Sequence, residues 1–216
     1  MKPQAPVTKK NIDDFLYQVL ETEIGGVEVY RMAILCARNE DLKEEWTKYL
    51  EQTERHVVVV RDLFNKLGMD PEATTPGRQI VRDKGKALLS AMQKALKDAP
   101  LAAQIVAAEC VVDAETKDHG NWTLIGALAE NATGTLKKAL TKAYDEVEDE
   151  EDEHLYHTRG WCRELWMESL GLPAVLPPPE EKKDVKTAVQ AARAAGERQP
   201  KPKKDGDSGR RPQSRA

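Results

Sequence analysis

The sequence contains few cysteines, few phenylalanines and no long apolar run. Among its 216 residues are three cysteines and two phenylalanines. Cys36, Cys110 and Cys162 lie far apart in no metal-ligand spacing, and their odd number argues against a disulfide framework. No apolar segment approaches the about 20 residues that span a bilayer, and residues 1–10 lack the apolar segment of a secretory signal. These absences predict a soluble, cytoplasmic protein that contacts no membrane.

Two further absences bear on catalysis. Gly25 and Gly26 fall inside a predicted helix, and Gly77 and Gly85 do not open a strand-to-helix turn, so the sequence offers no loop that would cradle a phosphate. We expect these four glycines to permit close helix packing. No serine or cysteine has a credible general base near it in the sequence, and hydrolase chemistry therefore has no support.

The net charge of −4 is unevenly distributed along the chain. Residues 180–216 carry eleven Lys or Arg against six Asp or Glu, a balance of +5, which leaves −9 for residues 1–179. We expect residues 1–10 to be disordered and residues 177–216 to form a Pro-rich linker and a basic, mostly disordered tail, with a short helix near residues 185–195. This tail is either solvated or a contact for nucleic acid or an acidic surface, although it offers no aromatic side chain for base stacking.

Apolar residues at helical spacing predict four long amphipathic helices, at residues 12–37, 42–67, 101–130 and 135–171. Asn11 is the expected N-cap of the first helix, and Gly68 is expected to end the second. A shorter helix at residues 79–96 has an expected apolar face of Ile80, Ala87, Leu88, Ala91 and Leu96. An all-α fold follows, in which residues 11–176 form a four-helix bundle with this short helix in the crossover between the second and third long helices.

Each long helix carries a carboxylate or an imidazole in the middle of its apolar face. The fourth helix shows this most clearly, since Glu151 and His154 interrupt a stripe of apolar residues. Leaving both groups unpaired in a dry core costs several kcal/mol, so a metal ion is the leading explanation. The full set of candidate ligands is Glu23, His56, Glu115, His119, Glu151 and His154. These residues converge if the helix midpoints lie at one level.

Other readings of these residues stay open at the level of the sequence. Glu151 and His154 could pair with Arg159 or Lys142, or face water if the helix is rotated by one position. His56 could be a hydrogen-bonded core histidine. Rotating the third helix would turn a competing set inward: Glu109, Asp113, Thr116 and Asp118.

The pattern resembles the ferritin-like superfamily of di-iron and di-manganese carboxylate proteins. That family takes one Glu from each of two helices and a Glu-x-x-His pair from each of the other two. Glu151 with His154 matches the fourth-helix pair. Glu23 and Glu115 resemble the single glutamates, and each is followed seven residues later by an aromatic residue, Tyr30 or Trp122. The resemblance covers residues 12–171.

The second helix departs from the family pattern, because Thr53 takes the position of its bridging glutamate while His56 is in place. We expect His119 to compensate as an extra nitrogen ligand, in either an altered two-metal site or a single-metal site. The resemblance implies iron, with manganese or zinc as alternatives, and ferroxidase or oxygen-dependent redox activity toward dioxygen or peroxide, or metal storage. It also implies a homodimer. The alternative function is that of a metal-free helical bundle acting as an interaction or stress-associated protein.

Overall fold

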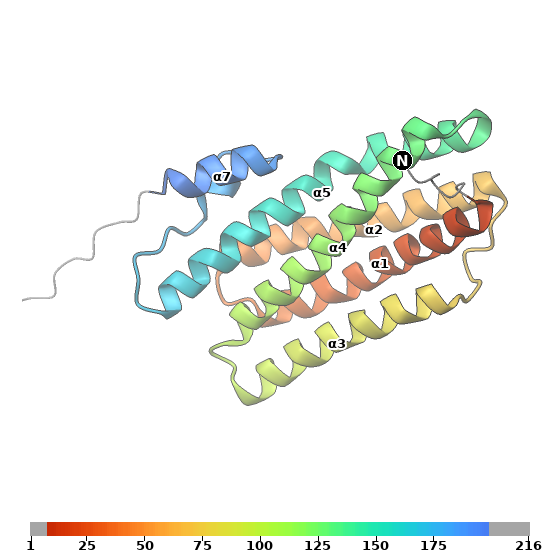
Figure 1. Cartoon of the computed structure of the whole chain (residues 1–216). Coiled ribbons are helices and arrows are strands. Elements are labelled where there is room, and N and C mark those ends of the chain that lie inside the picture. The colour runs from red at the N-terminus through yellow and green to blue at the C-terminus, as the bar shows by residue number, and fades with distance from the viewer. Residues whose placement is uncertain (1–7, 199–216) are drawn as a thin grey trace, which may run out of the picture.

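The chain folds as an all-helical bundle. The computed structural model describes residues 8–198, which form seven helices and no strand. Four long helices, α1 (Lys9–Cys36), α2 (Glu40–Leu67), α4 (Ala103–Asn131) and α5 (Gly134–Ser169), lie side by side, and α3 (Pro76–Asp98) packs outside them against α1 and α4 (Figure 1). The expected all-α bundle with an extra helix in its crossover is confirmed. Within the described residues, no helix combines the length and apolar character needed to cross a membrane.

Local side-chain chemistry sets the helix ends. The Thr8 hydroxyl accepts a hydrogen bond of 3.2 Å from the Asn11 amide, so α1 begins at Lys9 and the expected cap, Asn11, lies in its first turn. Lys9 and Lys10 are therefore helical, although they belong to the segment expected to be disordered. Gly68 ends α2 with a φ of 66°, as expected, because a left-handed residue there favours glycine.

Two apolar clusters fill the bundle, one toward each end. One contains Trp46, Tyr49, Met92 and Trp161, and the other contains Phe64, Trp122 and Leu140, among further residues. The midpoints of α1, α2, α4 and α5 lie between these clusters. Polar residues at those midpoints are therefore closed off from water at both ends of the bundle.

Helix α3 is rotated relative to its expected apolar face. Ile80 is 58% exposed and Leu96 36% exposed, and of the five expected residues only Leu88 packs against the core. The helix buries Met92 and Arg78 instead. Arg78 Nε lies 2.7 Å from Glu21 Oε2 on α1. This ion pair and Met92 set the face that α3 presents, which a pattern of apolar residues alone does not reveal.

Much of residues 177–198, expected to belong to the linker and tail, is folded onto α5. We call residues 172–198 the C-terminal strap; it contains α6 (Pro179–Lys182) and α7 (Ala188–Gly196), the latter close to the short helix expected at residues 185–195. Arg163 Nη1 lies 2.6 Å from Glu180 Oε1, and Arg198 Nε lies 2.6 Å from Glu164 Oε1. The rest of the expected basic tail, residues 199–216, lies outside the described residues.

Candidate metal centre

Five of the six candidate ligands meet at the middle of the bundle. Glu23 from α1, His56 from α2, Glu115 from α4, and Glu151 and His154 from α5 are each no more than 4% exposed. Their ligand atoms form two groups of three, each with all atoms within 4.8 Å of one another: Glu23, His56 and Glu151, and Glu115, Glu151 and His154. We call these groups the two triads. Glu151 belongs to both.

The ligand atoms lie close together without forming hydrogen bonds among themselves. Glu151 Oε1 lies 3.0 Å from His56 Nδ1 and 3.5 Å from His154 Nδ1. Yet both Nδ1 atoms, and one oxygen each of Glu23, Glu115 and Glu151, have no hydrogen-bond partner among the described residues. A buried polar atom left unpaired costs about 1–3 kcal/mol. Five such atoms in one place form a cluster of ligand-type groups that could hold a metal ion.

In each histidine, a hydrogen bond at Nε2, which points away from the triads, orients Nδ1 toward them. His56 Nε2 lies 2.8 Å from Glu150 Oε2, and His154 Nε2 lies 3.0 Å from Gln52 Oε1. Because both partners are oxygen acceptors, each Nε2 carries a proton and donates it. With Nε2 protonated in this way, loss of the proton on Nδ1 would present the Nδ1 lone pair to the centre, as metal ligation requires.

The carboxylates of the centre draw positive charge to it. Burial alone would lower the pKa of His154, but the neighbouring Glu115 and Glu151 outweigh it and raise that pKa to about 10. Burial alone would likewise raise the pKa of Glu151, whereas His154 and His56 lower it to about 2. Burial raises the pKa of Glu23, and the charges of Asp118 and Glu151 raise it further. Protons and metal cations therefore compete for the same oxygens and nitrogens.

The two aromatic residues noted in the sequence lie beside the centre, each near the ligand of the other helix. Trp122, seven residues after Glu115, donates from Nε1 to Glu23 Oε1 over 2.8 Å. Tyr30, seven residues after Glu23, is fully buried, and burial together with the charge of Glu115 raises its pKa. The indole bond fixes one oxygen of Glu23, which leaves Oε2 for the triad.

Tyr49 is a neighbour of the centre that the sequence did not single out as more than a core residue. Its ring centroid lies 4.2 Å from that of His154. Its hydroxyl donates to Glu45 and lies 2.9 Å from His157 Nδ1. Glu45 is one helical turn before Tyr49 on α2. This spacing is the feature of the sequence from which their hydrogen bond could have been predicted.

Thr53 supplies no ligand. It is 2% exposed, and its hydroxyl donates to the Tyr49 carbonyl oxygen over 2.9 Å. A Cβ added at Gly26 would lie 3.2 Å from Thr53 Cγ2, so α1 and α2 approach closely at this level. Glu151 is consequently the one carboxylate shared between the triads.

His119 is the predicted ligand that the structure does not bring to the centre. Its Nδ1 lies 3.0 Å from Asp152 Oδ1, and its side chain is 30% exposed. Asp118, the competing residue, is 5% exposed, and burial together with the charges of Glu151 and Glu115 raises its pKa. The inward face of α4 runs through Glu115, Asp118 and Trp122, which turns residue 119 toward the flank of α5. The expected extra nitrogen ligand is therefore absent from the triads.

Oxygen and imidazole atoms make up the two triads, because Cys36, Cys110 and Cys162 all lie in or against the apolar cluster around Trp46. Such a ligand set suits iron, manganese or zinc better than metals that prefer sulfur. Comparisons of the chain with protein-family models, curated proteins and solved structures found no match. Function is therefore inferred from the chemistry of the centre itself.

Proposed function

We propose that this chain is a ferritin-like metal-binding protein whose bundle centre holds two divalent cations, iron first, with manganese or zinc as alternatives. The observation that carries the proposal is the pair of buried triads that share Glu151, whose five residues each have one buried atom without a hydrogen-bond partner. Each triad offers two carboxylates and one imidazole. This ligand set agrees with the ferritin-like pattern, apart from Thr53.

The ligand roles follow from the triads. Glu23 and His56 would hold one cation, Glu115 and His154 the other, and Glu151 would contact both. Bound ferrous ions would supply the electrons that reduce dioxygen or peroxide, so ferroxidase or oxygen-dependent redox activity is the proposed reaction. The protein orients the ligands through Trp122, Glu150 and Gln52, and its two apolar clusters exclude water.

Thr53 leaves the centre with less negative charge than the family pattern provides. The two triads contain three carboxylates, whereas a glutamate at position 53 would add a fourth. Three negative charges do not fully neutralise two divalent cations. We therefore expect weaker binding of the pair of cations than a four-carboxylate centre would give.

Metal titration tests the proposal. The purified chain is expected to bind about two ferrous ions under anaerobic conditions and to develop the near-ultraviolet absorption of oxidised iron on exposure to air. Glu151→Gln preserves the shape of the shared ligand but removes its charge, and it should abolish binding at both triads. Asp149→Asn, at an exposed position on the same helix, is the matched control. Unchanged metal content in Glu151→Gln would refute the assignment.

A second candidate is a metal-free bundle acting as an interaction or stress-associated protein, and Thr53 is the observation that favours it. This function predicts that chelator and added metal leave the thermal stability unchanged, and that His56→Ala and His154→Ala do not alter that result. The homodimer stays a prediction. So does nucleic-acid contact through the basic tail, much of which lies outside the described residues.

A further inference from the structure

A pocket of about 440 Å³ lies outside the metal centre, between α1, α3 and α4. Its volume falls within the range of about 300–1,000 Å³ that small-molecule sites occupy. Gly25 and Val29 contribute to its α1 wall, and Val81 and Leu88 to its α3 wall. Glu23 is directed toward the bundle interior, so the pocket opens on a different face of α1 from the metal centre.

Two helix glycines leave this pocket open. A Cβ added at Gly25 or at Gly85 would meet no atom within 4 Å. Close packing therefore does not require either glycine, contrary to the role expected from the sequence, whereas it accounts for Gly26. A glycine inside a helix costs about 0.5–1 kcal/mol relative to alanine. Two such glycines, one on each side of the pocket, keep its volume open.

Two lysines give the pocket a cationic end. Lys84 on α3 and Lys117 on α4 both line it. The Lys117 ammonium donates to the amide oxygen of Asn121, a neutral group. No residue between 8 and 198 forms an ion pair or hydrogen bond with Lys84. Within residues 8–198, both lysines therefore lack an anionic partner in contact with them.

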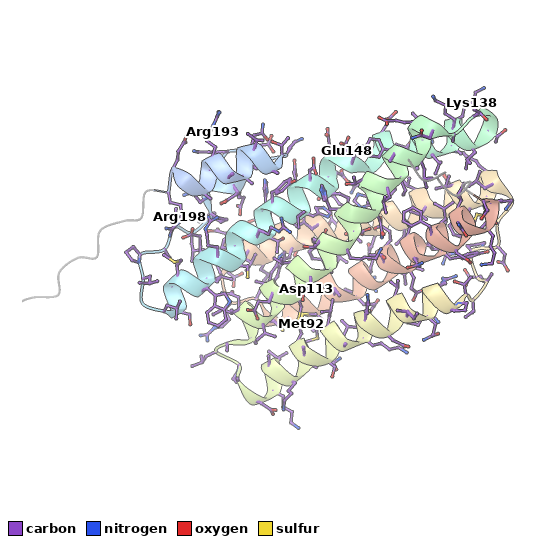
Figure 2. All side chains as sticks on the ribbon, viewed as in Figure 1. Met92, Asp113, Lys138, Glu148, Arg193 and Arg198 are labelled. Carbon is purple, nitrogen blue, oxygen red and sulfur yellow. The ribbon has the colours of Figure 1, made fainter. Side chains whose placement is uncertain are left out.

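The acidic residues of the pocket wall do not neutralise this end. Glu21 is held by Arg78 and Arg82, at 2.7 Å and 2.6 Å. Asp113, labelled in Figure 2, lies one helical turn from Lys117 on α4. Because α4 runs antiparallel to α3 (Figure 1), that turn leads away from Lys84 and toward the level of Leu88. One end of the pocket thus has two cations, and its apolar wall extends from there.

We propose that the pocket binds an amphipathic carboxylate, with its carboxylate between Lys84 and Lys117 and its aliphatic chain extending from there against Val29 and Leu88. A carboxylate there would relieve the repulsion between the two ammonium groups. The α1 wall from Thr22 to Val29 spans about 10 Å at 1.5 Å per residue, which suits a medium-length chain. This site is separate from the proposed metal centre and does not depend on it.

Calorimetric titration of the full chain with decanoate, below its micelle concentration, tests this proposal. Saturable binding of one decanoate per chain is expected, with weaker binding of decanol and none of decyltrimethylammonium. Gly85→Leu fills the pocket and should weaken decanoate binding at least about tenfold, while its thermal stability stays at or above that of the wild type because leucine favours helix. Gly120→Leu is the matched control, since its Cβ also meets no atom within 4 Å and it does not line the pocket.

Charge variants separate the carboxylate contact from the apolar one. Lys84→Gln combined with Lys117→Gln should weaken decanoate binding about tenfold and leave decanol binding unchanged. Glu151→Gln should bind decanoate as the wild type does, so a failure of the metal proposal would not affect this result. Absence of decanoate binding to the wild type, or equal binding to Gly85→Leu, would overturn the assignment of this pocket.

Discussion

Gln52 accepts a hydrogen bond of 3.0 Å from His154 Nε2 and so determines which nitrogen of that ring faces the proposed metal centre. In Gln52→Leu the buried Nε2 loses its acceptor, and the ring is free to turn. We expect the affinity for ferrous iron to fall about 10–100-fold, the range typical of groups that orient a metal-ligating histidine. The number of ions bound at saturation should not change. Anaerobic titration calorimetry measures both quantities.

The control variants separate orientation from general damage. Gln52→Glu keeps an oxygen acceptor for His154 Nε2 but loses the amide that hydrogen-bonds Glu150, so we expect its affinity to exceed that of Gln52→Leu without matching the wild type. Gln93→Leu, at an exposed position on α3, should have no effect. Wild-type affinity in Gln52→Leu would show that this hydrogen bond does not position the ring.

The sequence showed which residue types form the centre more reliably than it showed which side of each helix faces inward. Glu151 and His154 could be found because charged and imidazole groups at inward positions are costly unless something binds them. Asp118 and His119 lie about 60° and 40° to either side of Glu115 at 100° per residue, so periodicity alone does not choose between them. The packing of α4 on α5 decides, since it brings His119 to Asp152. Gln52 had no comparable signal, because an uncharged polar residue beside a helix stripe is ordinary.

At the scale of elements, the helix ends were predictable where a glycine stands at the boundary. Gly68 and Gly134 mark helix boundaries in the sequence, and both adopt a left-handed φ. The face of α3 and the C-terminal strap were not predictable, because each is fixed by contacts between distant residues. Arg78 with Glu21 orients α3, and Arg198 with Glu164 fastens the strap. From the sequence alone, charged residues at these positions are expected to face solvent.

Two glycine-to-alanine changes should shift stability in opposite directions. Gly68→Ala places a Cβ on a residue with a φ of 66° and should lower the free energy of unfolding by about 1 kcal/mol. Gly85→Ala, inside α3 with no atom within 4 Å of the added Cβ, should raise it by about 0.5–1 kcal/mol. Urea unfolding of the two variants beside the wild type measures both effects. Stabilisation by Gly68→Ala would contradict the left-handed cap.

The attachment of the strap should depend on pH through Glu164, which is fully buried. Burial alone would raise its pKa, but hydrogen bonds from Arg198, the Val175 amide and Arg163 outweigh it and lower the pKa. A lowered pKa in the folded state means that the ionised form stabilises the fold above the ordinary glutamate pKa of about 4.3. That stabilisation is lost as the pH falls through the folded-state value.

Glu164→Gln should therefore reduce the free energy of unfolding by about 2 kcal/mol at neutral pH, less than for a fully buried pair, because both arginines keep access to water. The difference from the wild type should be constant above about pH 5 and shrink below about pH 4.3. Urea unfolding across this pH range measures it. Glu168→Gln, at an exposed position on the same helix, is the control. A difference that grew toward acid pH would be incompatible with the lowered pKa.

At the scale of the whole molecule, the proposed metal centre and the apolar clusters share one core. The five ligands lie between the clusters, so the bundle closes around groups that would individually favour water. A ligand that binds those groups in the folded state, and not in the unfolded state, stabilises such a core. Because the ligands come from four helices, they are held together only when the bundle is assembled. Metal binding and global unfolding should therefore be coupled.

This coupling gives a measurement that requires no redox activity. Manganese or zinc at 100 times its dissociation constant should stabilise the folded chain by about 2.7 kcal/mol. For a domain of this size, that corresponds to a rise in Tm of about 5–10 °C. Glu151→Gln should lose most of the rise, since Glu151 belongs to both triads, whereas Asp149→Asn should keep it. An equal rise in Glu151→Gln would mean that the metal binds elsewhere, and no rise in the wild type would favour the metal-free bundle, because a cation held by four helices must oppose their separation.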